Sequence, residues 1–144
     1  MATATSIEGK IDLALQTKVV PLAQGLGLAI AAPGVEYEPD GVTPYLAVIF
    51  GRNTPINVAM SGTREPIRRG ILLLNVTWPT GAGTLAATEA AAALRTAFKF
   101  NTRVDFDGGF IKVTEEPTVQ GAIEGDNGYT LTPVTVPWQA FSTS

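Results

Sequence analysis

The spacing of apolar residues along the chain predicts two amphipathic helices. Near the N-terminus, apolar residues recur every three or four positions and so share one stripe of a helix: Ile7, Ile11, Leu15, Val19 and Leu22. Thr5 and Glu8 have the spacing of a capping box at the start of this helix, and Pro21 and Gly25 mark its end. A second helix is predicted after Thr84, with an apolar face made of Ala86, Ala90, Leu94, Ala97 and Phe98.

Shorter apolar stretches, bounded by Gly, Pro, Asn and Asp, predict the strands of a sheet. We expect strands at residues 27–32, 45–50 and 67–78, a hairpin at 106–115, and a further pair at 119–124 and 129–138. In the strand at 67–78, alternation places four residues on one face: Leu72, Leu74, Val76 and Trp78. In the last strand the apolar alternation slips, so we expect a bulge or an edge position near Pro133.

The order of these elements predicts an α+β fold, with a mixed or mainly antiparallel β-sheet and two α-helices packed on it. The length of 144 residues corresponds to one domain, residues 1–144. Residues 51–66, between two predicted strands, are longer than an ordinary connection, so we expect a long arm or hairpin there. Residues 139–144 are expected to form a short C-terminal tail.

The composition argues against an enzyme. The chain has no His and no Cys, which removes the commonest base, the thiol nucleophile and the usual zinc ligands, so we expect neither a cofactor nor a metal. The carboxylate pairs Glu36/Glu38 and Glu115/Glu116 leave glycoside hydrolysis open, although the sequence gives neither pair an apolar pocket. The start of the chain lacks the features of a signal peptide, and no apolar stretch approaches the roughly 20 residues that span a bilayer, so we expect neither secretion nor a membrane protein.

Charge is unevenly distributed along the chain. Residues 1–51 carry a net charge of −3, residues 52–112 carry +4 and residues 113–144 carry −4. Four arginines form the basic cluster, and we hypothesise that they pair with an acidic neighbouring subunit in a head-to-tail interface: Arg52, Arg64, Arg68 and Arg69. A DNA phosphate backbone, or a solvated strand end paired with Glu65, remains an alternative. Near the C-terminus, Trp138 is expected to close the core and Phe141 to anchor an interface.

Three sets of residues together resemble a known family. They are residues 68–76 running into 79–83, the Gly128-Tyr129 pair followed by 133–138, and 39–41 preceding 44–46. In this order and spacing they are similar to the phage tail terminator-like family of siphophages. One departure is the alanine-rich second helix, which carries only Glu89 and Arg95 as charged residues on its exposed face.

The resemblance implies a structural virion protein without catalytic residues or cofactors. Such a protein assembles in the host cytoplasm as a homo-oligomeric ring, typically a hexamer, at the head-proximal end of a long non-contractile tail. The ring stops polymerisation of the tail tube protein and presents a surface to the head-completion or neck protein. DNA passes through its lumen without specific binding, and we place Asp105, Asp107, Glu115 and Glu116 there because negative charge repels DNA.

The sequence is also compatible with other functions. The protein could be another tail-tube or head–tail connector component of similar fold. The four arginines would also suit a small nucleic-acid-binding module, although the acidic isoelectric point near 4.9 argues against it. A hydrolase would depend on Glu115 or Glu116.

Overall fold

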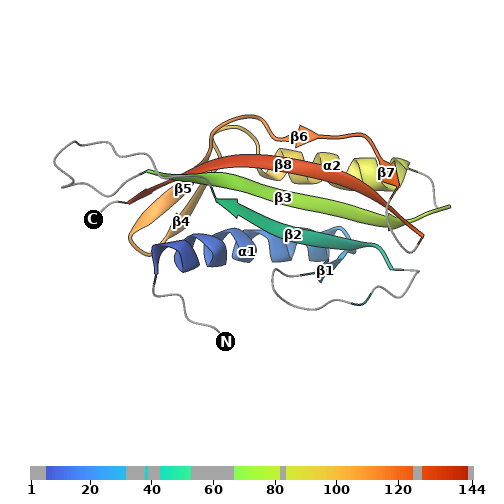
Figure 1. Ribbon diagram of the computed structural model, residues 1–144, viewed down its shortest axis with the longest axis horizontal. Coiled ribbons are helices and arrows are strands. Elements are labelled where there is room, and N and C mark those ends of the chain that lie inside the picture. The colour runs from blue at the N-terminus through green and yellow to red at the C-terminus, as the bar shows by residue number, and fades with distance from the viewer. Residues whose placement is uncertain are drawn as a thin grey trace.

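The computed structural model describes residues 6–31, 38, 43–52, 67–81, 84–124 and 128–142. Within these residues it contains two helices, α1 (Ile7–Gly25) and α2 (Leu85–Ala97), and eight strands. The strands are β1 (Ala29–Ala31), β2 (Tyr45–Arg52), β3 (Arg68–Pro79), β4 (Arg103–Phe106), β5 (Gly109–Val113), β6 (Thr118–Val119), β7 (Ile123–Glu124) and β8 (Tyr129–Ser142). The α+β class predicted from the sequence is confirmed (Figure 1).

All eight described strands join one mixed sheet. The strand order is β1-β2-β3-β8-β5-β4, and β6 and β7 also pair with β8. Only the β1–β2 pair is parallel among the pairs described, so the sheet is mainly antiparallel as expected. Figure 1 shows β3 and β8 running side by side along the long axis of the molecule.

The first helix follows its predicted stripe. Ile11, Leu15 and Val19 are fully buried, while Ile7 and Leu22 pack against the same core with partial exposure. The N-cap is Ser6, whose hydroxyl accepts a hydrogen bond from the Gly9 amide at 3.0 Å, so the predicted cap at Thr5 is off by one residue.

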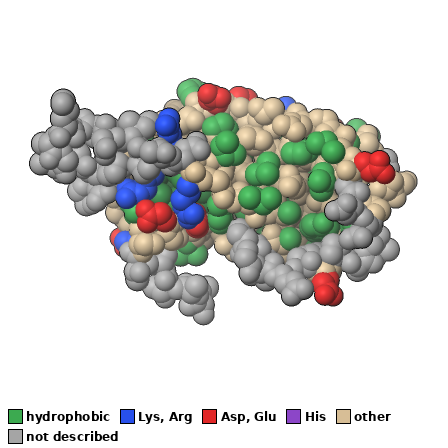
Figure 2. Space-filling model, viewed as in Figure 1, with side chains coloured by type: hydrophobic (Ala, Val, Ile, Leu, Met, Phe, Trp, Pro, Cys, Tyr) green, Lys and Arg blue, Asp and Glu red, His purple; other side chains and the backbone are tan. Residues whose placement is uncertain are grey.

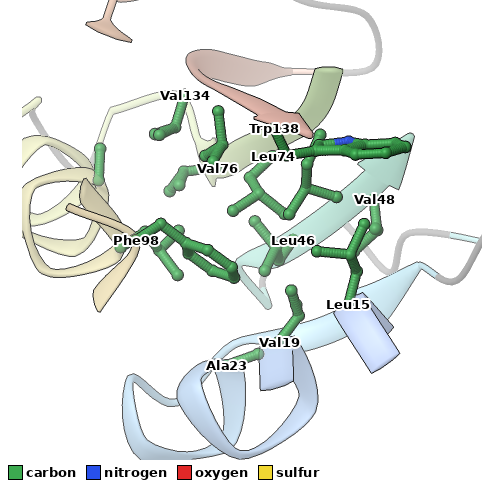
Figure 3. Packing of buried hydrophobic residues seen from close by; sticks show 14 of the residues in the cluster. Leu15, Val19, Ala23, Leu46, Val48, Leu74, Val76, Phe98, Val134 and Trp138 are labelled. Carbon is green, nitrogen blue, oxygen red and sulfur yellow. The ribbon is translucent and has the colours of Figure 1, made fainter. Parts of the chain in front are cut away.

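Both helices pack on the same face of the sheet. Alternate residues of β2, β3, β5 and β8 point to that face and join the helix residues in one buried cluster. Figure 3 shows Leu15, Val19 and Ala23 of α1 below Leu46 and Val48, with Phe98 approaching from the end of α2. Trp138 lies over Leu74 in the same view, which confirms its expected place in the core.

The second helix follows its predicted face except at one position. Ala90, Leu94 and Phe98 are buried and Ala97 packs against the core, whereas Ala86 is exposed and Ala87 and Ala91 are buried instead. Thr84 precedes the helix as expected, but its side chain makes no capping hydrogen bond. In a helix this rich in alanine, several stripes are almost equally apolar, so tertiary packing selects the face.

The expected irregularity near Pro133 lies in the partner strands and not in β8. β8 pairs with β3 without interruption, through Pro133 opposite Asn75 and Pro137 opposite Ile71. On the other edge of β8, Pro133 and Pro137 accept hydrogen bonds from the Gln120 and Thr114 amides. Because the amide and carbonyl of one strand residue point to the same side, both prolines turn their missing N–H toward this edge, where the partner is interrupted.

Along this edge, the segment of the chain that pairs with β8 passes from β5 to β6 and then to β7. Pro137 lies opposite the junction of β5 and β6, and Pro133 lies opposite the junction of β6 and β7. Between β6 and β7, three residues (120–122) face two on β8 (132–133), which is a bulge. The central strand therefore contains two prolines without losing a hydrogen bond to β3.

Two other predicted segments, the C-terminal tail and the arm, lie partly outside the described residues. β8 continues to Ser142, so most of the expected C-terminal tail is strand. Gly51 and Arg52 of the expected arm are the last residues of β2, and residues 53–66 lie outside the described residues.

Candidate assembly surfaces

Arg52 and Arg68 hold the two strand ends that flank residues 53–66. Arg52 ends β2 and Arg68 begins β3. Arg52 forms an ion pair with Asp12 and also donates a hydrogen bond to the Glu8 carbonyl oxygen at 3.4 Å. Arg68 Nε lies 3.1 Å from Glu8 Oε2. Both arginines thus have partners on α1 of their own chain, and the two strand ends are fixed to its first turns.

The two carboxylates that bind these arginines differ in electrostatics. The pKa of Glu8 is lowered, first by a hydrogen bond from its own backbone amide and then by Arg68. The pKa of Asp12 is raised because it is partly buried, and the neighbouring Arg52 only offsets this effect in part. Its Oδ1 atom is buried without a hydrogen-bond partner among the described residues. Glu8 therefore favours its charged form in the folded protein, whereas burial of Asp12 opposes it.

Arg69 lies on the opposite face of the sheet from Arg68, because consecutive strand residues point to opposite sides. The sheet register aligns it with Gln139, Lys112 and Arg103 in one row across β3, β8, β5 and β4. The structure thus splits the cluster expected from the sequence: Arg52 and Arg68 face α1, and Arg69 belongs to a basic row on the other face. Arg64 lies outside the described residues.

Phe141 lies beside this basic row near the end of β8. Its ring stacks on Phe110 with 5.2 Å between ring centroids. The Arg103 guanidinium lies 4.1 Å from the Phe110 centroid and its Nε is 2.8 Å from Asp105. Phe141 is half-buried and takes part in a cationic and aromatic cluster on the sheet face away from the helices.

The sheet face away from the helices is apolar and bears few charges. On β2 and β3 its side chains include Ile49, which is 47% exposed, and Ile71, which is 39% exposed. Leu73 and Leu131 continue the apolar surface across β3 and β8. Figure 2 shows hydrophobic side chains gathered over the region of β2, β3 and β8, with most Lys and Arg side chains at one end and acidic side chains scattered around the rim. We call this the uncovered face; no described helix packs on it.

Of the carboxylates considered for catalysis or for a lumen, the described Asp105, Asp107 and Glu116 have separate partners, and Glu36 lies outside the described residues. Asp105 pairs with Arg103, while Asp107 pairs with Lys10 at 3.2 Å. Glu116 accepts a weak hydrogen bond from the Phe100 amide at 3.5 Å near the end of α2. Among the described residues there is no group of three or more possible metal ligands. Within the same part of the chain, no helix has both the length and the apolar character needed to cross a membrane.

The partners of the arginines and the basic row have no clear signal in the sequence. Glu8 and Asp12 are separated from Arg68 and Arg52 by 60 and 40 positions, so only the tertiary fold brings them together. Lys112 and Arg103 could have been paired with each other from the two-residue turn of their hairpin, which fixes its register. Their alignment with Arg69 depends on the β3–β8 and β5–β8 pairings, for which the sequence has no local signal.

Known proteins resemble this chain in sequence and in fold. A family model described as phage tail terminator protein matches residues 10–138, which confirms the resemblance found in the sequence. A solved structure known only by an identifier has 21% identity, covers 97% of this chain and 99% of its own, and gives a TM-score of 0.76. A chain from the virion of a native gene transfer agent particle has 14% identity, covers 95% of this chain and 98% of its own, and gives a TM-score of 0.65. At these identities the two structures share the fold. None of the curated proteins matches the sequence.

Proposed function

The chain belongs to the phage tail terminator family, which is structural and not enzymatic, and from this premise we propose that it forms a ring on the tail. The ring, a hexamer, sits at the head-proximal end of a long non-contractile siphophage tail. There it stops polymerisation of the tail tube protein and provides the joining surface for a head-completion or neck protein. DNA passes through the lumen without specific binding.

The uncovered face is the observation that carries this proposal. One side of the sheet is packed by both helices, while the other leaves Ile49 and Ile71 about half exposed in a largely uncharged area. Contiguous exposed apolar surface of this kind marks contacts with other proteins. In a terminator, such a surface is covered when the subunit meets another component of the tail. The likeness to a chain of a virion particle supports the same location.

The charged residues take two roles in this proposal. Arg69 and Phe141 lie on the uncovered face, where they contact the neighbouring component directly. Arg52 and Arg68 act from the base of the arm, because their ion pairs with Asp12 and Glu8 fix the strand ends from which residues 53–66 extend. Arg64 contributes from within the arm.

Electron microscopy of the purified protein, alone and mixed with tail tubes from particles lacking it, tests the proposal. We expect a single ring at one end of each tube and no further growth of capped tubes. Long filaments from the protein alone would make it a tube subunit instead. A protein that remains dispersed and never binds a tube end would contradict the proposal, and retardation of DNA in a gel would then favour nucleic-acid binding.

The arm gives a second test of the same function. Deleting residues 54–62 leaves the ion pairs at both strand ends in place, so the fold should be retained. We expect the deletion variant to unfold at the same temperature as the wild type within a few degrees and to fail to cap tubes. Normal capping by the deletion variant would show that the arm is dispensable.

A further inference from the structure

A groove runs along the seam between α1 and the β4 hairpin. It has a volume of about 530 Å³ and is lined by five residues of α1, between Lys10 and Lys18, and by residues 103–107. Its apolar lining comes from Leu13, Ala14, Val104 and Phe106. Leu13 is 44% exposed and lies away from the buried stripe of α1. We call this the α1–β4 groove.

The groove contains one edge of the sheet at which no described strand pairs. β4 is a terminal strand of the described sheet and pairs only with β5. The Val113 amide donates to the Thr102 carbonyl, and hydrogen-bonded pairs alternate along an antiparallel ladder. The backbone groups of Arg103 and Asp105 therefore point away from β5. An unpaired strand edge of this kind binds an extended segment as an additional strand.

The charges around the groove already have partners within the chain. Lys10 pairs with Asp107, and Arg103 pairs with Asp105. The Lys18 ammonium lies 5.3 Å from the centroid of the Phe98 ring. A charged ligand would have to displace these contacts, whereas a neutral segment with apolar side chains would leave them in place. The occupant that fits is therefore uncharged and extended.

The chain itself contains such a segment. Residues 53–62 carry no charge, and within them Ile56, Val58 and Met60 alternate with small or polar residues. This alternation is typical of a strand with one apolar face. At about 3.3 Å per residue, the five residues 56–60 span about 16 Å, and the four residues of β4 span about 13 Å. The segment and the strand edge match in length and chemistry.

The position of α1 indicates which copy of the chain supplies the segment. At about 100° per residue, Glu8 and Asp12 lie on the opposite side of the helix from Leu13 and Thr17. Glu8 and Asp12 bind the two strand ends that flank residues 53–66, so the arm starts on one flank of α1 and the groove opens on the other. A segment of the same chain would have to cross α1 to reach this groove, because its two strand ends are bound on the other flank.

We propose that the α1–β4 groove binds residues 56–60 of a neighbouring copy of the chain, as a strand added to the edge of β4. The apolar side chains of Ile56, Val58 and Met60 would then lie against Leu13 and Val104. The added strand links each subunit to the next in one direction, which generates a ring when the rotation closes. This inference deepens the proposed ring function and rests on it.

Cysteine cross-linking tests this contact directly, because the chain has no Cys of its own. A chain carrying Leu13→Cys is mixed with a differently tagged chain carrying Ile56→Cys and oxidised. We expect a disulfide-linked heterodimer, in a yield roughly tenfold above that of the matched pair Leu13→Cys and Asn57→Cys, because neighbouring strand residues point to opposite faces. Equal yields from the two pairs would overturn the proposal.

The same substitutions in one chain separate the two possible sources of the segment. A doubly substituted chain, Leu13→Cys with Ile56→Cys, is oxidised at low concentration. We expect little intramolecular disulfide; a fast-migrating monomer as the main product would show that each chain fills its own groove and would overturn the proposal.

Assembly gives an independent readout. Leu13→Glu places a charge in the groove, and Leu85→Glu, at a 72% exposed position of α2, serves as the control. We expect both variants to fold, as judged by circular dichroism, and only Leu13→Glu to lose ring formation. If Leu13→Glu still forms rings that cap tubes, the groove proposal is wrong while the ring function stands. If the wild-type protein forms no rings and the Cys-substituted chains form no cross-link, both the groove proposal and the proposed ring function are wrong.

Discussion

At the scale of single residues, Gly70 is a position where no side chain fits without movement of its neighbours. It lies on the helix-covered face of β3, opposite Trp138 on β8. A Cβ atom there would lie 2.7 Å from Trp138 Cζ2 and would also collide with the Gly51 carbonyl oxygen. We expect Gly70→Ala to lower the free energy of unfolding by about 2–3 kcal/mol, because overpacking forces the indole or the backbone to move. Urea denaturation measures this change.

Gly25 gives the matched control for that substitution. It ends α1, and a Cβ atom there would meet nothing within 4 Å. We expect Gly25→Ala to be neutral or to stabilise the protein by about 0.5 kcal/mol, because alanine is a better helix former than glycine. An equal loss of stability in both variants would show that close approach to Trp138 is not the cause.

The lowered pKa of Glu8 predicts a pH dependence, because a hydrogen bond from its own backbone amide and then the neighbouring Arg68 favour the carboxylate. The folded-state pKa of Glu8 lies below the ordinary value of 4.5, so its contribution to stability is present above pH 4.5 and is lost as the pH falls through the lower folded value. Because Glu8 is half-exposed, we expect Glu8→Gln to lower the free energy of unfolding by only about 0.5 kcal/mol at pH 7 and by almost nothing near pH 3. Urea denaturation at both pH values measures the difference. The exposed Glu89→Gln is the control, and a loss that is the same at both pH values would contradict the assignment.

At the scale of secondary structure, α1 is held to the sheet by its buried stripe. Leu15 is 2% exposed within the core, whereas Leu13, two residues away, is 44% exposed. We expect Leu15→Ala to lower the free energy of unfolding by about 2–4 kcal/mol, because less apolar surface is buried and a cavity remains. Leu13→Ala should lower the free energy of unfolding by less than about 1 kcal/mol. Thermal and urea denaturation measure the stability of both variants. Equal losses of stability would place Leu13 in the core of the free protein.

The elements show what the sequence could and could not predict. The stripe of α1 and the alternation in β3 were predicted correctly, since each contrasts apolar with polar positions along a local period. The face of α2 was wrong at Ala86 because an alanine-rich helix offers little contrast. The two prolines of β8 signalled an interruption, but only the pairing shows that the interruption lies in β5, β6 and β7.

The candidate assembly surfaces were less predictable than the fold. The sequence gathered Arg52, Arg68 and Arg69 into one cluster, because they are close in the chain or at the ends of adjacent strands. In the structure, strand alternation separates Arg69 from Arg68, and contacts across 40 and 60 positions supply Asp12 and Glu8 as partners. Charge composition alone does not show which face a strand residue occupies, and therefore does not show which charged groups it can reach.

At the scale of the whole molecule, the fold is one-sided. Both helices cover one face of the sheet, and the other keeps an apolar surface that the described residues of the isolated chain leave open. The α1–β4 groove lies on the helix side, so the two surfaces point in different directions. A subunit with two different contact surfaces assembles in a directional manner, which suits a ring that ends a tube on one side and receives a neck protein on the other.

A charge on the uncovered face tests whether that face is a contact surface. Ile71 is already 39% exposed, so Ile71→Lys should change the free energy of unfolding by less than about 1 kcal/mol in the free chain. Once another protein covers this face, the introduced ammonium group loses its hydration and gains no ion-pair partner. This makes the free energy of assembly less favourable by several kcal/mol in every subunit. We therefore expect a folded variant whose rings or tube caps are lost in electron micrographs, while Leu85→Lys on α2 assembles normally. If Ile71→Lys caps tubes as well as the wild type, the uncovered face meets solvent in the assembled tail, and the contacts between subunits depend on the helix side alone.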